Sequence, residues 1–436
     1  MNVLEAERIV GIETFFAPFE GVGGKLRSQP EDFIVTEISN YPKKSKTGKF
    51  LIADVTTKNW ETNLFVRELS NKLHISRQRI NFAGTKDKRA VTTRVISIYK
   101  VTSNQVSNIN IKNVKIENAY RSDFPVKIGN LAGNKFDIVI RNINKNIGIE
   151  SVENIINYLE ESGGFPNFYG IQRFGIIRPI THIVGKFIVK DDFEKAVMKY
   201  VGNPMKEEDA ESFKQRERFE KTRDCSEALK SYPNNLNFEK AILNKLVNNP
   251  NNYVGALKEL PNNLLTMFIY AYQSYLFNRI LSERIRRKLP LNRAIIGDMI
   301  LPIRRGLIDT SAIKVSNSNI SKVNLQISKK KAVVSGILFG CDTEFSEGEM
   351  GEIEHKIIDT EKIDPRDFII PDIPRISSNG SRHPLLAFVD NIDCKILNDD
   401  LNEGKNSFNL KFSLKKGCYA TSLLREFMKA DDIKNY

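Results

Sequence analysis

A segment in the first third of the chain and another near its C-terminus share one pattern, the alternation of apolar and polar residues that is typical of a half-buried strand. Residues 133–141 (GNKFDIVIR) place Phe136 and Ile140 on one face, and residues 408–412 (FNLKF) alternate in the same way. An early run at residues 30–38 (PEDFIVTEI) also resembles a strand. Helical spacing is found between the strand-like runs, so we predict an α+β fold with a mixed β-sheet flanked by helices.

Between about residues 180 and 380 the character of the chain changes. Residues 205–232 are highly charged and have few apolar positions, which is typical of solvent-exposed helices. A long amphipathic helix is expected over residues 262–287. Strands are expected at three later segments, MILPI (299–303), VNLQI (323–327) and AVVSGIL (332–338). This part of the chain therefore predicts a second domain with its own core.

One acidic residue among three bases marks the stretch of residues 81–94, NFAGTKDKRAVTTR. Asp87 stands beside Lys86, Lys88 and Arg89, shortly after a strand-like run. Neighbouring cations favour the ionised form of a carboxylate, and loops at strand ends often carry function. A reactive carboxylate is one interpretation. The charge pattern alone favours the other, a solvated loop aspartate or a helix cap.

Aromatic residues are concentrated in residues 165–175, FPNFYGIQRFG, together with Arg173. Aromatic rings and arginine can stack on unpaired nucleobases and pair with phosphate. The alternative is an aromatic minicore around a tight turn, and the pattern by itself favours that alternative.

The charge balance narrows the class of partner. The chain has 66 Lys and Arg against 53 Asp and Glu, a net charge of +13, which favours RNA, DNA or an anionic membrane surface. Its start lacks the features of a signal peptide, and no apolar run is long enough to span a membrane. Four scattered cysteines without a CxxC pattern argue against a zinc site and a disulfide framework. We expect a cytoplasmic protein without a bound metal.

The segment GTKDKRAVTT, residues 84–93, resembles the signature of the TruD family of RNA pseudouridine synthases, in which a Gly-x-Lys-Asp motif carries the catalytic aspartate. Five other blocks are similar to the family's pattern and follow its order along the chain: PEDFIVTEI (30–38), GNKF (133–136), PNFYGIQRFG (166–175), AYQSYLFNRIL (271–281) and GCYATSLLREFM (417–428).

This resemblance implies a domain plan. A pseudouridine-synthase catalytic domain with a mixed sheet would be formed by residues 1–164 and 381–436. An inserted α/β TRUD domain would occupy residues 165–380. The charged segment 205–250 makes the chain long for the family and resembles the archaeal and eukaryotic branches, the archaeal branch above all.

The resemblance also implies roles for individual residues. Asp87 becomes the catalytic carboxylate, and Phe33, Asn134 and Phe136 become substrate contacts. Tyr419 stands where bacterial members usually have Phe, so it keeps the ring and adds a hydroxyl.

Basic residues complete the set of predicted site residues. Arg27 lies where the family often has Lys, and it is counted among the substrate contacts. Lys86, Lys88 and Arg173 are predicted RNA contacts. Arg27 or Arg173 is expected to be the cation that keeps Asp87 ionised, since neighbouring residues of an extended segment point away from each other.

The activity implied is the isomerisation of uridine to pseudouridine in RNA, with uridine 13 of tRNA as the expected target. No redox partner or group donor is needed, so we expect no cofactor. The expected partner is tRNA, with no membrane and no obligate protein partner. Three alternatives remain: a non-catalytic tRNA-binding or RNA-folding protein, a pseudouridine synthase acting on another RNA, and an RNA methyltransferase. The last would need a glycine-rich nucleotide-binding motif, which we do not find.

Overall fold

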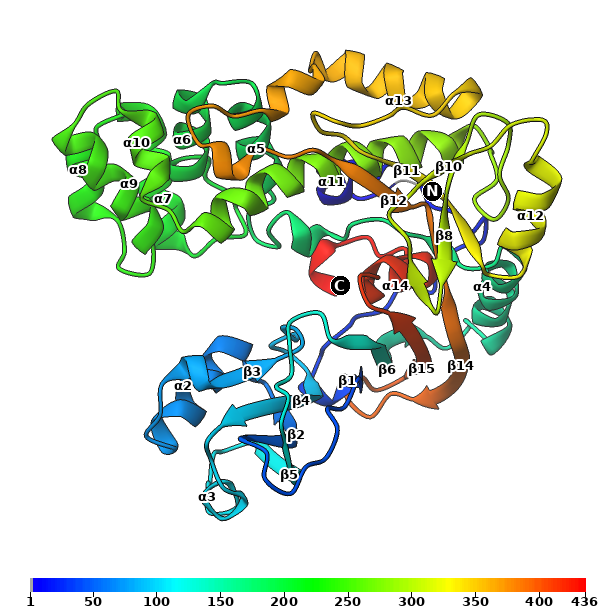
Figure 1. Cartoon of the computed structure of the whole chain (residues 1–436), viewed down its shortest axis with the longest axis horizontal. Helices are drawn as coiled ribbons and strands as arrows, with labels where there is room; N and C mark the ends of the chain where they lie inside the picture. Colours follow the sequence, from blue (N-terminus) through cyan, green and yellow to red (C-terminus); the bar gives the residue numbers. More distant parts are fainter. Residues whose placement is uncertain (1–2) are drawn as a thin grey trace. The chain divides into compact units, whose positions relative to one another are not determined.

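A computed structural model describes residues 3–436, and these divide into two compact units that each contain two separate stretches of chain (Figure 1). We call Ala17–Phe165 together with Ala387–Tyr436 the sheet unit. Pro166–Leu386, together with the N-terminal residues up to Phe16, forms the helix-rich unit. The predicted limits 164/165 and 380/381 lie close to these limits, but residues before Ala17 pack with the helix-rich unit. The functional domain boundaries stay a prediction.

The sheet unit contains a mixed eight-stranded sheet with the order β14-β15-β6-β1-β4-β2-β5, and β3 pairs with β4 at the side. Only the β1–β4 pairing within this sheet is parallel; the others are antiparallel, as recorded for the described residues. The predicted α+β fold with a mixed sheet is therefore confirmed. Its strands are β1 (Phe33–Ser39), β2 (Phe50–Lys58), β3 (Ile80–Phe82), β4 (Val91–Tyr99), β5 (Val114–Ser122), β6 (Leu131–Asn144), β14 (Val389–Asn398) and β15 (Lys405–Lys415).

Helix α2 covers part of the sheet because it presents one apolar stripe to it. Helix α2 buries Phe65, Val66 and Leu69 against residues of β2 and β4. Its first turn is capped by Glu61, whose carboxylate accepts the backbone N–H groups of residues 63 and 64. The helices of this unit are α2 (Thr62–Lys72), α3 (Ser103–Ser107), α4 (Ile149–Glu161) and α14 (Ala420–Met428).

The helix-rich unit is arranged along α11, which is buried over most of its length and packs against α5, α13 and β11 (Figure 1). A five-stranded antiparallel sheet with the order β10-β8-β11-β12, in which β9 pairs with β8, completes the unit. Its helices are α1 (Glu5–Ile9), α5 (Thr181–Val189), α6 (Phe193–Val201), α7 (Ala210–Thr222), α8 (Cys225–Ser231), α9 (Asn237–Asn248), α10 (Tyr253–Lys258), α11 (Asn262–Arg286), α12 (Ile320–Ser328) and α13 (Gly348–Glu361). Its strands are β8 (Met299–Arg304), β9 (Leu307–Ile308), β10 (Ile313–Lys314), β11 (Ala332–Leu338) and β12 (Ser381–Pro384), while the short β7 (Phe165–Pro166) and β13 (Leu386–Ala387) lie where the chain passes between units.

Most of the elements expected in this region are confirmed, including the long helix at 262–287 and the exposed helices within 205–232. The strand expected at residues 323–327 is wrong, because this segment lies in helix α12. Val323 and Ile327 are buried while Leu325 is exposed. Four-residue spacing therefore places the two buried residues on one face of a helix, and the alternation of the segment is coincidental.

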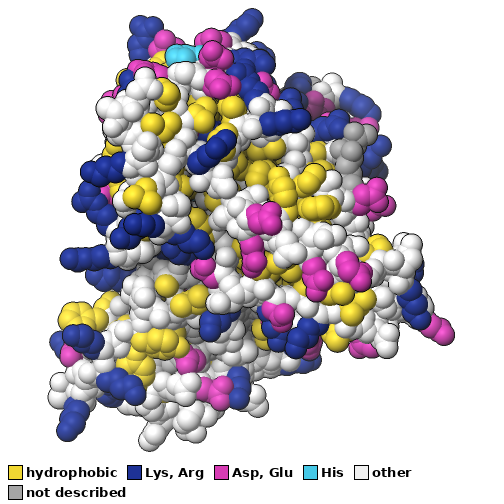
Figure 2. All heavy atoms as spheres, turned by 90° about the vertical axis from the view of Figure 1, so that its right-hand side faces the viewer, with side chains coloured by type: hydrophobic (Ala, Val, Ile, Leu, Met, Phe, Trp, Pro, Cys, Tyr) yellow, Lys and Arg dark blue, Asp and Glu magenta, His cyan; other side chains and the backbone are white. Residues whose placement is uncertain are grey.

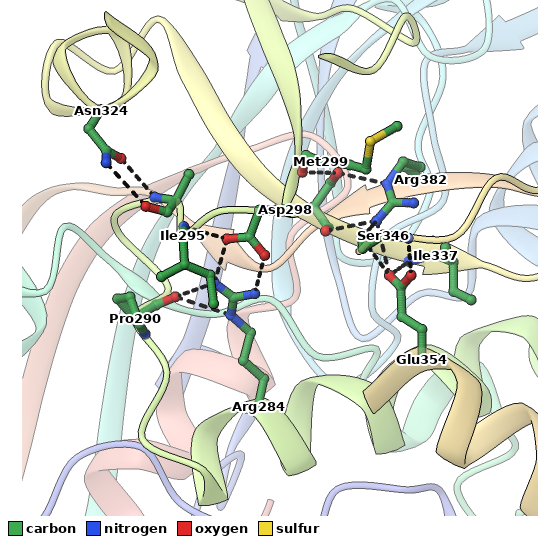
Figure 3. Close-up of polar contacts among 12 residues, drawn as sticks. Arg284, Pro290, Ile295, Asp298, Met299, Asn324, Ile337, Ser346, Glu354 and Arg382 are labelled. Atoms are coloured by element: carbon green, nitrogen blue, oxygen red, sulfur yellow. Dashed lines mark hydrogen bonds and ion pairs between the residues drawn. The ribbon is translucent and has the colours of Figure 1, made fainter. Parts of the chain in front are cut away.

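Two polar networks hold the interior of the helix-rich unit together, and both are saturated with hydrogen bonds (Figure 3). The Arg284 guanidinium binds both carboxylate oxygens of Asp298, at 2.6 and 2.9 Å, and also donates to the Pro290 carbonyl. In the second network, Arg382 donates to Glu354 at 3.0 Å and to the Ser346 hydroxyl at 2.7 Å. Buried charges are tolerated when they are paired and fully hydrogen-bonded in this way.

Charge and apolar groups on the surface are mixed. On the face shown in Figure 2, Lys and Arg side chains are interspersed with Asp and Glu, and the positive charge does not form one continuous patch there. Among residues 3–436, no helix is both long enough and apolar enough to cross a bilayer.

Candidate active site

Asp87 lies in the connection between β3 and β4, two strands that pair antiparallel with Ile80 opposite Ile98. Its carboxylate is 55% exposed. Thr62 holds the backbone of this connection in place. The hydroxyl oxygen of this buried residue accepts the backbone N–H of Lys86 at 3.0 Å. An accessible acid is thus carried by a loop whose backbone is anchored one residue away.

Arg27 is the cation nearest to Asp87, with 3.7 Å between its Nη2 and the carboxylate Oδ1. Its backbone is left-handed, with φ of 53°, and Arg89 donates to its carbonyl oxygen at 2.9 Å. The guanidinium carbon lies 3.9 Å from the centroid of the Phe33 ring. Burial lowers the pKa of Arg27 from its usual value, and Asp87 acts in the opposite direction. The prediction that Arg27 accompanies Asp87 therefore agrees with the geometry, although its contact with a substrate stays a prediction.

The strand register places three of the predicted site residues, Phe33, Asn134 and Phe136, on one face of the sheet. In the antiparallel pairing of β1 with β6, Val35 lies opposite Phe136 and Glu37 lies opposite Asn134. Phe33 and Glu37 are both buried, since residues two apart on a strand share a face. A carboxylate on a buried face needs a partner, and Glu37 obtains one from the loop that carries Asp87.

That partner is Lys86. Its ammonium lies 2.8 Å from Glu37 Oε2 and donates to Asn134 Oδ1 at 2.9 Å. The two charged side chains are 6% and 1% exposed, so this is an interior ion pair. It ties the loop to the sheet. This geometry favours a positioning role for Lys86, and its predicted RNA contact stays untested.

The same contact orients Asn134. Because a lysine ammonium can only donate, the atom facing it must be the amide oxygen. The Nδ2 group of Asn134 has no acceptor within the part of the chain that the structure describes. Asn134 therefore offers its Nδ2 donors in a fixed orientation, beside an amide oxygen that already accepts one hydrogen bond.

Three phenylalanine rings form a row on this face. Phe136 stacks on Phe412 of β15 with a centroid distance of 5.1 Å and an interplanar angle of 21°. Phe33 meets Phe136 edge-on at 6.3 Å. Phe136 is 8% exposed, so one of its faces is covered by protein and only a small part is accessible.

Several buried residues that were not predicted as site residues hold the surroundings of the Asp87 loop in place. Arg94, 1% exposed, donates to the Thr62 hydroxyl at 2.8 Å and to Thr92 at 3.0 Å. Burial lowers the pKa of Arg94 to about 10, with Glu37 and Glu61 opposing this shift. A signal for Glu37 was present in the sequence, since it falls in phase with Phe33 and Val35 on the apolar face of its strand.

The remaining predicted residues lie as follows. Tyr419 directly precedes α14 and follows β15, the strand whose Leu414 pairs with Asn134. Lys88 is exposed on the Asp87 loop. Arg173 belongs to the helix-rich unit, at the end of the short turn Ile171–Arg173. Within the described residues, no group of three or more His, Cys, Asp or Glu side chains could hold a metal ion.

Comparison with known proteins places this chain beside a group of archaeal sequences. The family model for tRNA pseudouridine synthase D (TruD) matches residues 9–427. A "Probable tRNA pseudouridine synthase D" from Methanococcoides burtonii is 41% identical over 99% of both chains, and one from Methanosarcina acetivorans is 41% identical over 100% of this chain and 99% of its own. A crystal structure from Methanosarcina mazei that carries the same family name superposes with a TM-score of 0.90, at 39% identity and complete coverage of both chains.

Proposed function

Because the chain belongs to the TruD family of tRNA pseudouridine synthases, we propose that it isomerises uridine to pseudouridine at position 13 of tRNA, with Asp87 as the catalytic carboxylate. The observation that carries this proposal is the half-exposed Asp87 beside a desolvated arginine, on a loop tied to the sheet by Lys86 and Glu37. The acid is accessible while its surroundings are fixed, which is what a preorganised site requires.

The reaction exchanges one bond of the uracil ring for another. The bond between N1 and the ribose C1′ breaks, the ring turns and C5 bonds to C1′. The proton on C5 is lost, and N1 takes up a proton. Atoms and electrons balance within the nucleotide, so no oxidant, reductant or group donor takes part. Asp87 acts at the sugar, either as the nucleophile at C1′ or as the base that removes a sugar proton. Arg27, 3.7 Å away, stabilises the ionised carboxylate that either role needs.

The target uridine must leave its helix before the reaction, which costs a few kcal/mol. The exposed part of Phe136 provides an apolar surface for the freed base, and the buried Phe33 ring supports Phe136 edge-on. Base–aromatic stacking contributes about 1–3 kcal/mol. Asn134 then donates through Nδ2 to a uracil carbonyl, because the hydrogen bond from Lys86 to Oδ1 fixes the orientation of the amide. In this proposal Tyr419 and Lys88 contact the RNA near the target.

The test is to incubate the purified protein with an unmodified tRNA transcript, without added cofactor, and to map pseudouridine at single-base resolution. Wild type should modify position 13, and Asp87→Asn should lose activity by on the order of 10⁴-fold or more. Asp123→Asn, a change of another exposed aspartate in the sheet unit, is the matched control and should behave as wild type.

Each other result has a definite meaning. Pseudouridine at another position or in another RNA would keep the chemistry and overturn the substrate. Tight tRNA binding without product would favour a non-catalytic RNA-binding protein. An Asp87→Asn variant as active as wild type would remove Asp87 from the mechanism.

A further inference from the structure

The helix-rich unit contains a small cavity of its own, with a volume of about 230 Å³. Its wall combines the aromatic motif of residues 165–175 with α11 and the segment before β12. The lining includes Tyr169, Arg173, Gln273, Ser378 and Ser381. Sites for drug-sized ligands usually measure about 300–1,000 Å³. This cavity is therefore suited to a single ring system.

Two polar side chains in the cavity present a donor beside an acceptor. The amide of Gln273 donates through Nε2 to the Phe339 carbonyl at 2.7 Å and to Ser378 Oγ at 3.0 Å. A carbonyl oxygen can only accept, so the amide orientation is fixed and Oε1 is left as an acceptor. Gln273 is 4% exposed, and Oε1 has no donor within residues 3–436.

Ser378 supplies the donor. Its hydroxyl oxygen accepts from Gln273 and, more weakly, from the backbone N–H of Gly380 at 3.4 Å. The hydroxyl proton has no acceptor among the residues that the structure describes. Every nucleobase presents a donor beside an acceptor on its pairing edge, and the Ser378–Gln273 pair matches that edge.

The aromatic part of the wall is held rigidly. Asn278, which is fully buried, accepts the backbone N–H of Tyr169 and donates to its carbonyl, both at 2.9 Å. The Tyr169 ring stacks on His383 with a centroid distance of 4.7 Å. Burial lowers the pKa of His383 to about 4, with Arg173 adding to this shift, so the ring of this histidine is neutral near pH 7.

Arg173 adds a cation with spare capacity. Its guanidinium carbon lies 5.9 Å from the centroid of the Tyr169 ring. Its Nε is buried and has no hydrogen-bond partner in the described chain. Arg173 lines the cavity, and phosphate oxygens next to a bound base are acceptors for a guanidinium group in that position.

We propose that this cavity binds one unpaired nucleobase of the RNA substrate, other than the uridine that is modified, with Gln273 and Ser378 on its pairing edge, Tyr169 against its ring and Arg173 towards its phosphate. This inference rests on the proposed function for the identity of the RNA. It gives the helix-rich unit a recognition role: the enzyme reads a second extruded base.

The test uses the full-length Asp87→Asn protein and a set of tRNA transcripts in which one nucleotide at a time lacks its base. We expect one such position, distinct from the modified uridine, to weaken binding by about tenfold. Ser381→Phe fills the mouth of the cavity from an exposed strand position. It should weaken binding of intact tRNA by a similar factor and abolish the effect of that abasic position. Ser328→Phe, on exposed surface of α12, is the matched control.

Ser378→Ala gives a second, smaller perturbation, with an expected loss of about threefold to tenfold at the same abasic position. Thermal melting checks that each variant is folded. If Ser381→Phe and Ser378→Ala bind every transcript as the parent does, or if their losses simply add to the abasic losses, the inference is wrong. Binding of free nucleoside monophosphates to the cavity without coupling to any tRNA position would also overturn it. Pseudouridine formation by wild type is measured separately, so failure of the cavity inference and failure of the proposed function are distinguishable.

Discussion

Asp298 and Asp87 each face an arginine, and their surroundings differ in almost every respect. Asp298 is fully buried, receives two short hydrogen bonds from Arg284 and accepts the Ile295 N–H at 2.9 Å (Figure 3). Asp87 is 55% exposed, and Arg27 stands 3.7 Å away. Within residues 3–436 no hydrogen bond reaches the Asp87 carboxylate. A saturated acid stabilises the fold, whereas an acid with free oxygens beside a held cation can react.

The largest effect on stability is expected for the buried Arg284–Asp298 pair. Asp298→Asn leaves the Arg284 charge buried without a counter-charge, so the free energy of unfolding should fall by about 3–5 kcal/mol. Urea denaturation of the full chain measures this loss. Asp309→Asn is the control, because Asp309 pairs with a largely exposed Arg304, and this change should destabilise the protein far less. Equal losses in the two variants would break the comparison.

The effects of the Lys86–Glu37 ion pair on stability and on activity can be measured separately. Glu37→Gln leaves the Lys86 ammonium buried and unpaired and should destabilise the protein by about 3 kcal/mol. Adding Lys86→Met removes the stranded charge and should restore most of that stability, since an apolar replacement of a buried pair is often neutral. Pseudouridine formation should not recover, because Asn134 has lost the donor that orients it. A double variant with full activity would reduce the pair to a purely structural element.

The helix-rich unit should be less stable in acid than at neutral pH. Burial lowers the pKa of His182 and of His383 to about 4 in the folded chain, against about 6.5 for an exposed histidine. Between pH 4 and pH 6.5 the unfolded chain binds more protons than the folded chain. The contribution of the two neutral histidines to the free energy of unfolding is therefore complete above pH 6.5 and is lost as pH falls towards 4. We expect a loss on the order of 2 kcal/mol per histidine at pH 5.

Urea midpoints at pH 7 and pH 5 measure this loss. In His383→Gln the neutral side chain no longer titrates, so the difference between the two midpoints should shrink relative to wild type. An unchanged difference would mean that His383 does not resist protonation, and that His182 or the carboxylates account for the acid sensitivity.

The smallest effect is expected at Arg27, the cation beside Asp87. Arg27→Gln removes the charge beside Asp87 and should slow single-turnover pseudouridine formation by about tenfold. Arg27→Lys keeps the charge and should remain within about threefold of wild type. Melting temperatures should hardly change in either variant, because the pair is partly exposed. A large loss of stability in Arg27→Gln would place Arg27 among the structural residues instead.

The sequence predicted those features that depend on local pattern. Alternation at residues 133–141 and 408–412 predicted strands β6 and β15, and the motif around Asp87 predicted the accessible acid. The Lys86–Glu37 contact could not be predicted in the same way, because it joins a loop to a strand through a register that only the folded sheet defines. The segment 323–327 shows the opposite failure, since five residues of alternation fit a strand and a helix face equally well.

The arrangement of the candidate site depends on contacts that the sequence does not reveal. Asn134 was expected to contact the substrate, and its amide oxygen accepts a hydrogen bond from Lys86. Phe136 was also expected to contact the substrate, and one of its faces stacks on Phe412. Both contacts join residues that are distant in sequence, and the substrate roles of Asn134 and Phe136 stay predictions.

The pairing of β6 with β15 also has a consequence for biosynthesis. Phe136 lies opposite Phe412, and the long helix-rich segment separates the two residues in sequence. During translation β6 leaves the ribosome well before its partner, so its edge stays open until the final strands emerge. Sequence-distant pairing of this kind slows folding. The row formed by Phe33, Phe136 and Phe412 can therefore assemble only after the C-terminal segment has been synthesised.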